Sequence, residues 1–341
     1  MIVFIQFNRK IISLIIGAIG LIIAGIIVFY GLQPVDRQAS QVRLINIPQG
    51  ASTIQIATLL AEEQVIRNPL LFRMLTRIER LDNKLQAGEY ELVAGMTSTE
   101  VLRKLALGET VSYIFTIPEG FTVEQIALLL ADKNLADRER FLALARRENT
   151  TADSENTISP FGYAIEGFLF PDTYRISKGM KEEEIIALML KRFNATVTGE
   201  MRTKAASQGL TLHQLMTLAS LVEREAKSAS ERPIIAAVFL HRLRIEMPLQ
   251  SCATIQYILG TPKQELSVQD TQIESPYNTY LHTGLPPGPI ANPGVDSVSA
   301  VLYPADTEVL YFVAKSDGTH IFSKTYEEHL QAIEQINNTT E

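Results

Sequence analysis

The chain of 341 residues is long enough for a membrane segment and two modest domains, and 46% of its residues are hydrophobic. Its formal net charge is −7 and it has no basic stripe with interleaved aromatic residues, which excludes a general nucleic-acid binder because phosphate contacts need clustered Lys and Arg. The only cysteine, Cys252, excludes an intramolecular disulfide and is expected to be a small buried apolar residue.

An uncharged apolar run, residues 11–31, follows a short tail of residues 1–10 that ends in Arg9 and Lys10. About 20 apolar residues span a bilayer as a helix, whereas the apolar region of a signal peptide has roughly 7–15. The segment LQPVDRQAS that follows contains no A-x-A cleavage site. We therefore expect an uncleaved anchor in membrane lipid, with the tail in the cytoplasm and the rest of the chain outside, by the positive-inside rule.

A repeat at a constant offset comes next. Residues 47–61 read IPQGASTIQIATLLA, and residues 117–131 read IPEGFTVEQIALLLA. In each copy a short alternating run predicts a strand, and Pro-x-Gly ends that strand in a turn. An amphipathic helix then begins, capped by Ser52 or Thr53 in the first copy and by Thr122 in the second.

The first copy extends into a larger unit. A strand over 42–47 and its helix precede a second helix over 68–81 and a returning strand within 85–92 (LQAGEYEL). A strand–helix–helix–strand unit of this size resembles a LysM-type glycan-binding module, and the alternative is a rigid spacer with its own core. We expect a LysM-like region with the internal repeat over 42–145 and a polar linker over 146–160.

The C-terminal half contains a helix that presents a glutamate to apolar surface. Thr211 and Gln214 form a capping box, and apolar residues then recur at helical spacing. Glu223 lies at the edge of this apolar stripe, whereas Glu225 is about 200° further round the helix and is expected to face solvent. Burial raises the pKa of a carboxyl, and a carboxylic acid protonated near neutral pH can donate to a leaving-group oxygen. The alternative is an ordinary ion pair, for which the sequence offers Lys227, Arg242 and Arg244.

A polar loop over 275–294 (SPYNTYLHTGLPPGPIANPG) is rich in hydroxyl, amide and aromatic groups, which are the groups that hold sugars. Its prolines and glycines make it stiff, which suits a preorganised site, and the alternative is a surface connector. A second polar cluster begins at Gln250. The sequence contains no motif for metal, serine-hydrolase or nucleotide chemistry. The histidines have no metal-ligand spacing, and there is no G-x-S-x-G and no phosphate-binding glycine loop. Carboxyl chemistry without a metal or a cofactor remains.

The chain resembles the endolytic murein transglycosylases, also called YceG-like proteins, over nearly its whole length. Besides the membrane helix, the IPxG repeats and LQAGEYEL, the resemblance rests on EGFLFPDTY (166–174), LASLVEREA (218–226) and YNTYLHTGLPPGPIANPG (277–294). It implies an α+β fold with an N-terminal transmembrane helix, a LysM-like α/β module and a C-terminal α+β catalytic domain over 161–336. The family motif A-S-[IL]-V-E assigns the catalytic glutamate to Glu223. Cys252 stands where some relatives have Asp.

The motifs and the two polar clusters together give the candidate substrate-binding residues, which are Ser220, Gln250, Ser251, Tyr257, Tyr277, Asn278, Thr279 and Tyr280. The resemblance implies a lyase at the bacterial inner membrane, acting on glycan strands beside membrane-bound peptidoglycan synthases. The lyase that the resemblance implies cleaves the β-1,4 bond between N-acetylmuramic acid and N-acetylglucosamine of nascent peptidoglycan. It leaves 1,6-anhydro ends, and the cut terminates strand elongation. Glu223 protonates the glycosidic oxygen and then accepts the proton of the sugar's own C6 hydroxyl, which attacks C1.

Two alternatives remain open. A lysozyme-like hydrolase needs a second carboxylate near Glu223. The candidates are Glu166, Asp172, Asp270, Glu274 and Asp296. A membrane-anchored wall-binding scaffold without catalytic activity needs only the repeat, and Glu223 is then a structural ion-pair partner. Analysis of the strand ends distinguishes the three functions.

Overall fold

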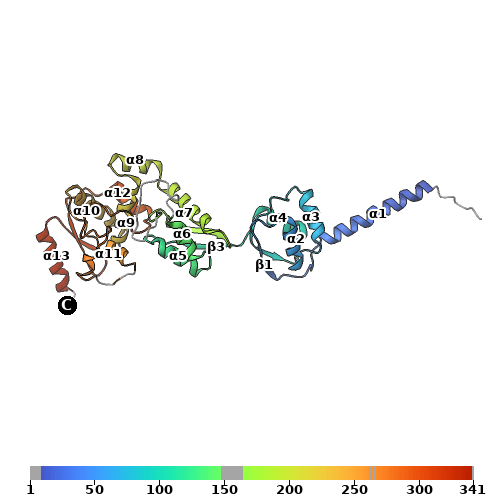
Figure 1. Cartoon of the computed structure of the whole chain (residues 1–341), viewed down its shortest axis with the longest axis horizontal. Helices are drawn as coiled ribbons and strands as arrows, with labels where there is room; N and C mark the ends of the chain where they lie inside the picture. The colour runs from blue at the N-terminus through green and yellow to red at the C-terminus, as the bar shows by residue number, and fades with distance from the viewer. Residues whose placement is uncertain (1–8, 147–163, 261–262, 264–265, 340–341) are drawn as a thin grey trace, which may run out of the picture. The chain divides into compact units, whose positions relative to one another are not determined.

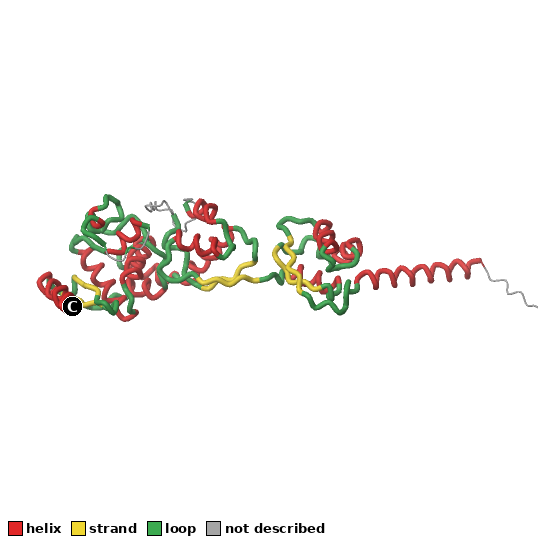
Figure 2. The backbone as a smooth tube through the Cα atoms, turned by 90° about the horizontal axis from the view of Figure 1, so that it is seen from below, coloured by secondary structure: helices red, strands yellow, loops and turns green. Residues whose placement is uncertain are grey.

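The computed structural model describes residues 9–146, 164–260, 263 and 266–339, with side chains from residue 14 onward. The chain is a mixture of helices and strands, as the sequence predicts (Figure 1). It divides into two compact units, Met1–Tyr113 with Arg175–Gly179 and Ile114–Tyr174 with Met180–Glu341. Within the described residues the strands form two-stranded sheets only, which Figure 2 draws in yellow among the helices.

The N-terminal helix α1 (Arg9–Leu32) contains the apolar run expected from the sequence. Its segment Leu14–Leu32 is long and apolar enough to cross a membrane, and none of it is buried inside the protein. A core helix of the same composition would be buried, so this helix is compatible with a membrane anchor.

The first repeat copy forms the body of the first unit. Its elements are β1 (Val42–Ile47), α2 (Thr53–Glu62), α3 (Pro69–Ile78), β2 (Gly88–Val93) and α4 (Ser98–Leu107). This confirms the predicted order of strand, helix, helix and strand. β1 and β2 are antiparallel, with Ile45 opposite Tyr90, and both side chains are buried in the core of the unit. Ser52 caps α2 in a capping box with Gln55.

The second copy has the same order of elements, with a long insertion before its last strand. It consists of β3 (Ser112–Thr116), α5 (Val123–Asp132), α6 (Arg138–Ala145) and β4 (Thr173–Ser177), and β3 pairs with β4. Thr122 caps α5 as predicted. Most of this copy belongs to the second unit, so the structure divides the predicted region 42–145 at residue 113. The predicted linker 146–160 lies outside the described residues except for Arg146, the C-cap of α6.

Backbone hydrogen bonds explain why the second copy joins the second unit. The N–H of Gly120 donates to the carbonyl of Asn292, and the N–H of Asn292 donates to the carbonyl of Phe121. The Asn292 side chain donates to the carbonyl of Phe121 as well and accepts from the N–H of Leu169. A buried amide that satisfies several backbone groups at once holds the segments together tightly.

The rest of the second unit is mainly helical. Its helices are α7 (Glu182–Thr196), α8 (Gly199–Ser207), α9 (Leu212–Glu225), α10 (Arg232–Arg244), α11 (Cys252–Leu259), α12 (Val295–Leu302) and α13 (Tyr326–Thr339). Strands β5 (Tyr311–Ala314) and β6 (His320–Ser323) form an antiparallel hairpin. α9 lies at the centre and contacts α8, α10, α11 and α12. Residues 215–222 of α9 are all buried, so this helix is covered on every side rather than along the single stripe expected from its sequence.

Candidate active site

Glu223 lies in the last turn of α9, where the fully buried run of this helix ends. Its side chain is only 7% exposed. The predicted capping box of Thr211 and Gln214 starts the helix and thereby sets its register. The sequence predicts that Glu223 lies at the edge of the apolar stripe, against apolar surface, and its low exposure agrees with this position.

Donors from two other helices hold the carboxyl of Glu223. The N–H of Gly294, the N-cap of α12, donates to Oε2 at 3.0 Å, and the Ser297 hydroxyl donates to the same oxygen at 2.8 Å. The carboxyl therefore lies at the N-terminus of α12, where the helix dipole favours an anion. The Nη2 of Arg232, at the start of α10, lies 3.5 Å from Oε1.

The ion-pair partner of Glu223 is therefore Arg232 and not one of the three basic residues suggested by the sequence. Arg242 is buried, and its guanidinium donates to the carbonyls of Leu249 and Leu310. Arg232 also donates from Nε to the Ser297 hydroxyl at 3.1 Å, so the same serine contacts both members of the pair.

A second carboxyl lies at this site, from a residue that sequence reasoning missed. Glu119 belongs to the turn before α5, and its Oε2 lies 3.8 Å from Nη2 of Arg232. It packs on the backbone of Gly294 so closely that a Cβ there would lie 1.9 Å from Oε1 of Glu119. Burial and the nearby Glu223 raise the pKa of Glu119. The repeat contained a signal for Glu119, because the first copy has the uncharged Gln49 at the corresponding position.

Glu166, one of the predicted second carboxylates, is instead a buried structural group. It is 1% exposed, and it accepts hydrogen bonds from the Val123 N–H at 3.1 Å and from the Asn292 amide at 3.1 Å. The Tyr257 hydroxyl donates to it at 3.3 Å. Burial raises the pKa of Glu166 to about 8, against the hydrogen bonds from Val123 and Tyr257, which lower it. The residue thus joins the start of α5 to α11 and to the loop before α12.

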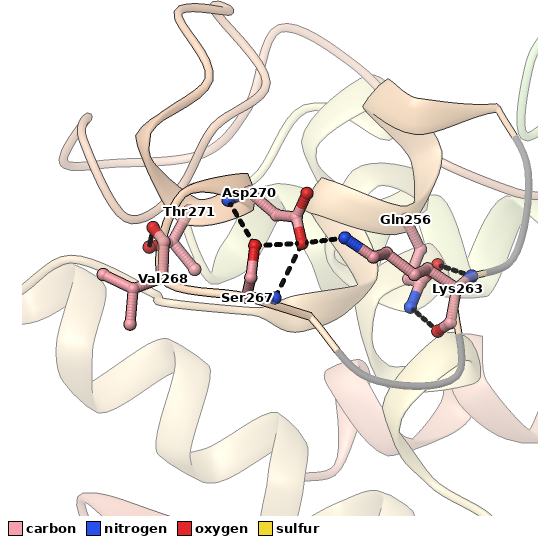
Figure 3. A network of polar contacts seen from close by, with 6 residues as sticks. All are labelled: Gln256, Lys263, Ser267, Val268, Asp270 and Thr271. Carbon is pink, nitrogen blue, oxygen red and sulfur yellow. Dashed lines mark hydrogen bonds and ion pairs between the residues drawn. The ribbon is translucent and has the colours of Figure 1, made fainter.

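The other predicted second carboxylates make different contacts. Asp270 accepts hydrogen bonds from the backbone and side chain of Ser267 and pairs with Lys263 at 2.6 Å (Figure 3). These contacts hold the pKa of Asp270 at about 2, with Lys263 the largest cause, which makes it a poor proton donor. Asp172 pairs with Arg192. Glu274 and Asp296 are exposed, and Asp296 lies in the first turn of α12, near Glu119.

Several predicted substrate-binding residues use their polar groups inside the protein. Ser220 is buried, donates to the carbonyl of Thr217 and accepts from the N–H of Ile290, so it joins α9 to the polar loop. Asn278 is buried and its amide donates to the carbonyls of Thr271 and Ile273. These residues shape the loop, and their hydrogen-bonding capacity is largely taken.

A second group of predicted binders surrounds the start of α11. Thr279 accepts a hydrogen bond from the Ser251 N–H and lies 3.0 Å from the Thr254 hydroxyl. The N–H of Gln250 donates to the carbonyl of Thr279, and the Gln250 side chain is exposed. The Tyr280 hydroxyl lies 3.0 Å from the sulfur of Cys252.

Two expectations in this region are corrected by the structure. Cys252 is exposed and not buried, because it is the first residue of α11 and follows the N-cap Ser251. Glu225 does not simply face solvent. It accepts hydrogen bonds from the Ser251 hydroxyl and from the Ala253 N–H, because the N-terminus of α11 lies beside the last turn of α9.

Tyr257 and Tyr277 lie deeper in the second unit. Both are buried, with ring centroids 5.4 Å apart, and the Tyr277 hydroxyl has no hydrogen-bond partner in the part of the chain that the structure describes. Tyr257 lines a cavity of about 650 Å³. The cavity is lined by Glu166 and Arg224 and, from α5 and α11, by Gln125, Leu128, Gln256 and Leu259. Neither carboxyl of the pair lines this cavity, but Arg224, which does, follows Glu223 in the chain and donates to the carbonyl of Gly120, the residue after Glu119.

The geometry defines a class of site. Two carboxyls of different exposure meet at one arginine and one helix N-terminus, and the next residue of α9, Arg224, lines a separate cavity. Such a set of groups can exchange protons with a bound substrate, and it can do so without a metal ion.

Comparisons with known proteins give the family. The profile of the YceG-like family matches residues 45–335. The endolytic murein transglycosylase of Bacillus subtilis (strain 168) is 37% identical over 320 residues, which cover 89% of this chain and 87% of the relative. The endolytic murein transglycosylase of Streptococcus pneumoniae (strain D39) is 32% identical over 87% of this chain and 59% of its own length.

A solved structure agrees. The crystal structure of a YceG-like protein from Listeria monocytogenes is 34% identical, covers 85% of this chain and 99% of its own, and superimposes with a TM-score of 0.56. The chain therefore belongs to the YceG-like family.

Proposed function

We propose that this chain is an endolytic murein transglycosylase, a carbon–oxygen lyase that cuts peptidoglycan glycan strands and leaves 1,6-anhydro-N-acetylmuramic acid ends. The observation that carries the proposal is Glu223, which combines the family motif A-S-L-V-E with a nearly buried carboxyl beside Arg232 and the N-terminus of α12. The Bacillus subtilis relative of that name, similar over most of both chains, supports the same activity.

The reaction needs proton transfer but no external nucleophile. Glu223 protonates the oxygen of the β-1,4 bond between N-acetylmuramic acid and N-acetylglucosamine and then accepts the proton of the C6 hydroxyl as this hydroxyl attacks C1. An attacking group within the same sugar lowers the entropic cost of the step. The cavity beside Arg224, about 650 Å³ in volume, is large enough to hold part of the strand next to the cleaved bond. Cutting nascent strands in this way ends their elongation.

The anchor suggests where the reaction happens. Helix α1 inserts in the bacterial inner membrane with its N-terminus in the cytoplasm, so that both units lie outside. Only nine residues separate the end of α1 at Leu32 from the start of β1 at Val42, which keeps the chain near membrane-bound peptidoglycan synthases. Alkaline phosphatase fused to the C-terminus should be active in cells, and an inactive but stable fusion contradicts this orientation.

The first unit acts as a LysM-like glycan-binding module. In support, a groove of about 940 Å³ lies between the turn after β1 and the segment between α3 and β2, and it is partly apolar. Ile54 and Met74 line this groove and are 52% and 56% exposed. In the inactive Glu223→Gln chain, changing both to Ser should weaken retention on purified glycan strands without unfolding the unit. Unchanged retention favours the spacer function.

The activity is tested by digesting un-crosslinked glycan strands with the wild-type chain and with Glu223→Gln, followed by mass analysis of the ends. Anhydro ends from the wild type only support the proposal. Reducing ends identify a hydrolase instead. Equal cleavage by both proteins removes Glu223 from the reaction, and no cleavage by a folded wild type favours the scaffold.

A further inference from the structure

We propose that Glu119 is a second catalytic carboxyl of this site, which delivers the proton to the departing sugar oxygen while Glu223 takes the proton of the attacking hydroxyl. The inference rests on the proposed function and deepens it, since it divides between two residues the transfers that Glu223 otherwise performs alone.

The geometry brings the two carboxyls to the same two groups, Arg232 and Gly294. Nη2 of Arg232 lies 3.5 Å from Oε1 of Glu223 and 3.8 Å from Oε2 of Glu119. Gly294 donates its N–H to Glu223 and leaves room on its Cα for the carboxyl of Glu119. The two side chains differ in solvent exposure: that of Glu119 is 48% exposed and that of Glu223 is 7% exposed. Glu119 is therefore the carboxyl more accessible to a polymer lying on the surface.

The internal repeat indicates that the acid at 119 is not needed to build its turn. The first copy has Gln49 in the same place, and the glycines that follow, Gly50 and Gly120, have nearly equal φ of 77° and 76°. A Cβ on Gly50 would meet no atom of the described residues within 4 Å, whereas one on Gly120 would lie 3.6 Å from the side chains of Glu223 and Arg224. The acid occurs in the copy that reaches α9, where it meets a second carboxyl.

Burial and charged groups on three helices together set the pKa of Glu119. Burial is the largest influence, followed by Glu223 on α9, and both raise the pKa of Glu119. Arg232 on α10 lowers it, and Asp296 on α12 raises it slightly. Arg224 donates to the carbonyl of the adjacent Gly120 at 3.4 Å. Glu119 thus keeps its proton to higher pH than an ordinary glutamate, as a general acid must.

The two transfers balance without another reactant. The bond between C1 of N-acetylmuramic acid and O4 of the next sugar breaks, and the proton of Glu119 goes to that O4. The C6 oxygen forms the new bond to C1, and its proton goes to Glu223. One proton exchanged through water after product release returns both carboxyls to their starting states.

A change of leaving group tests the division of labour. Wild type, Glu119→Gln and Glu223→Gln are compared on glycan strands and on a 4-nitrophenyl β-glycoside of an N-acetylmuramic acid-containing oligosaccharide, whose phenolate leaves without protonation. Glu200→Gln is the control, an exposed glutamate of α8 in the same unit. We expect Glu119→Gln to lower kcat on strands roughly 10²–10⁴-fold, with KM little changed, and to lower the rate on the aryl glycoside much less. Glu223→Gln should be impaired on both substrates.

Two results with Glu119→Gln overturn the proposal. Wild-type kcat in Glu119→Gln on strands removes Glu119 from the reaction, and an equal loss on both substrates makes it a positioning residue for Arg232. If the wild type leaves no anhydro ends, the proposed function fails, which is a separate outcome.

Gly294→Ala is a second variant that tests the proposal. The φ of −74° at Gly294 suits alanine, while the added methyl would displace the Glu119 carboxyl. It should lose strand cleavage yet unfold like wild type, and full activity contradicts the role of Glu119.

Discussion

The buried carboxyl of Glu166 predicts an unusual dependence of stability on pH. Its pKa rises from an ordinary 4.5 to about 8 in the folded protein, chiefly because it is buried. Since the folded state binds this proton more tightly than the unfolded chain, the contribution to stability is complete below about pH 4.5. It is lost as the pH rises toward about 8. At about 1.4 kcal/mol per pH unit, the full window corresponds to at most about 5 kcal/mol.

Glu166→Gln isolates this effect from the other titrating groups. The amide cannot ionise, so the free energy of unfolding of the variant lacks this one dependence on pH. Its nitrogen faces donors such as the Val123 N–H, which adds a cost that does not vary with pH. The difference in stability, wild type minus variant, should therefore fall by several kcal/mol between pH 5 and pH 8.5.

The assay is urea unfolding of the detergent-solubilised chain at several pH values. Because the chain has 11 tyrosines and no tryptophan, near-ultraviolet circular dichroism reports on the tyrosine environments. Tyr257, which donates to Glu166, and the adjacent Tyr277 are among them. A difference that stays constant from pH 5 to pH 8.5 would refute the reasoning, because it would mean that Glu166 has the same pKa in both states.

Three further predictions concern single residues. Gly167→Ala should destabilise the second unit by about 2–4 kcal/mol in urea unfolding, because φ is +87° and the methyl would lie 2.5 Å from the ring of Pro289. Asp270→Asn should leave the rate of strand cleavage within about twofold of wild type, since among the described residues its carboxyl contacts Lys263 and Ser267; a large loss would contradict this. Phe72→Ala, in the core of the first unit, should cost about 3–5 kcal/mol there, and hydrogen exchange should show faster opening of that unit while α9 stays protected.

Local features of the fold were accessible from the sequence because they depend on neighbouring residues. The N-cap at Thr122, the capping box at Thr211 and the order of elements in the first copy follow from spacing alone. The division of the chain at residue 113 was not accessible from the sequence. It depends on the contacts that Asn292 makes with residues far from it in the chain. Similar repeat sequences predict similar helices and strands, but they do not predict which other segments of the chain these elements contact.

The candidate site shows the same limit. The helical pattern places Glu223 against apolar surface at the edge of the stripe, and its side chain is nearly buried, although α9 is covered on every side. Arg232, Ser297 and Glu119 come from separate elements, so their convergence on one carboxyl has no signature in spacing. Glu225 was assigned to solvent because a helical pattern describes only its own helix and ignores the N-terminus of α11, where Ser251 contacts this glutamate.

The exposed thiol of Cys252 makes the chain ready for single-site labelling. It is the only cysteine, so a maleimide-linked fluorophore or spin label attaches at one position without prior mutation. Desolvation raises the pKa of the thiol, so the coupling should proceed faster at mildly alkaline pH. Because Tyr280 and the end of α9 lie close by, the response of such a probe to added glycan strands tests in real time whether a strand binds at this part of the second unit.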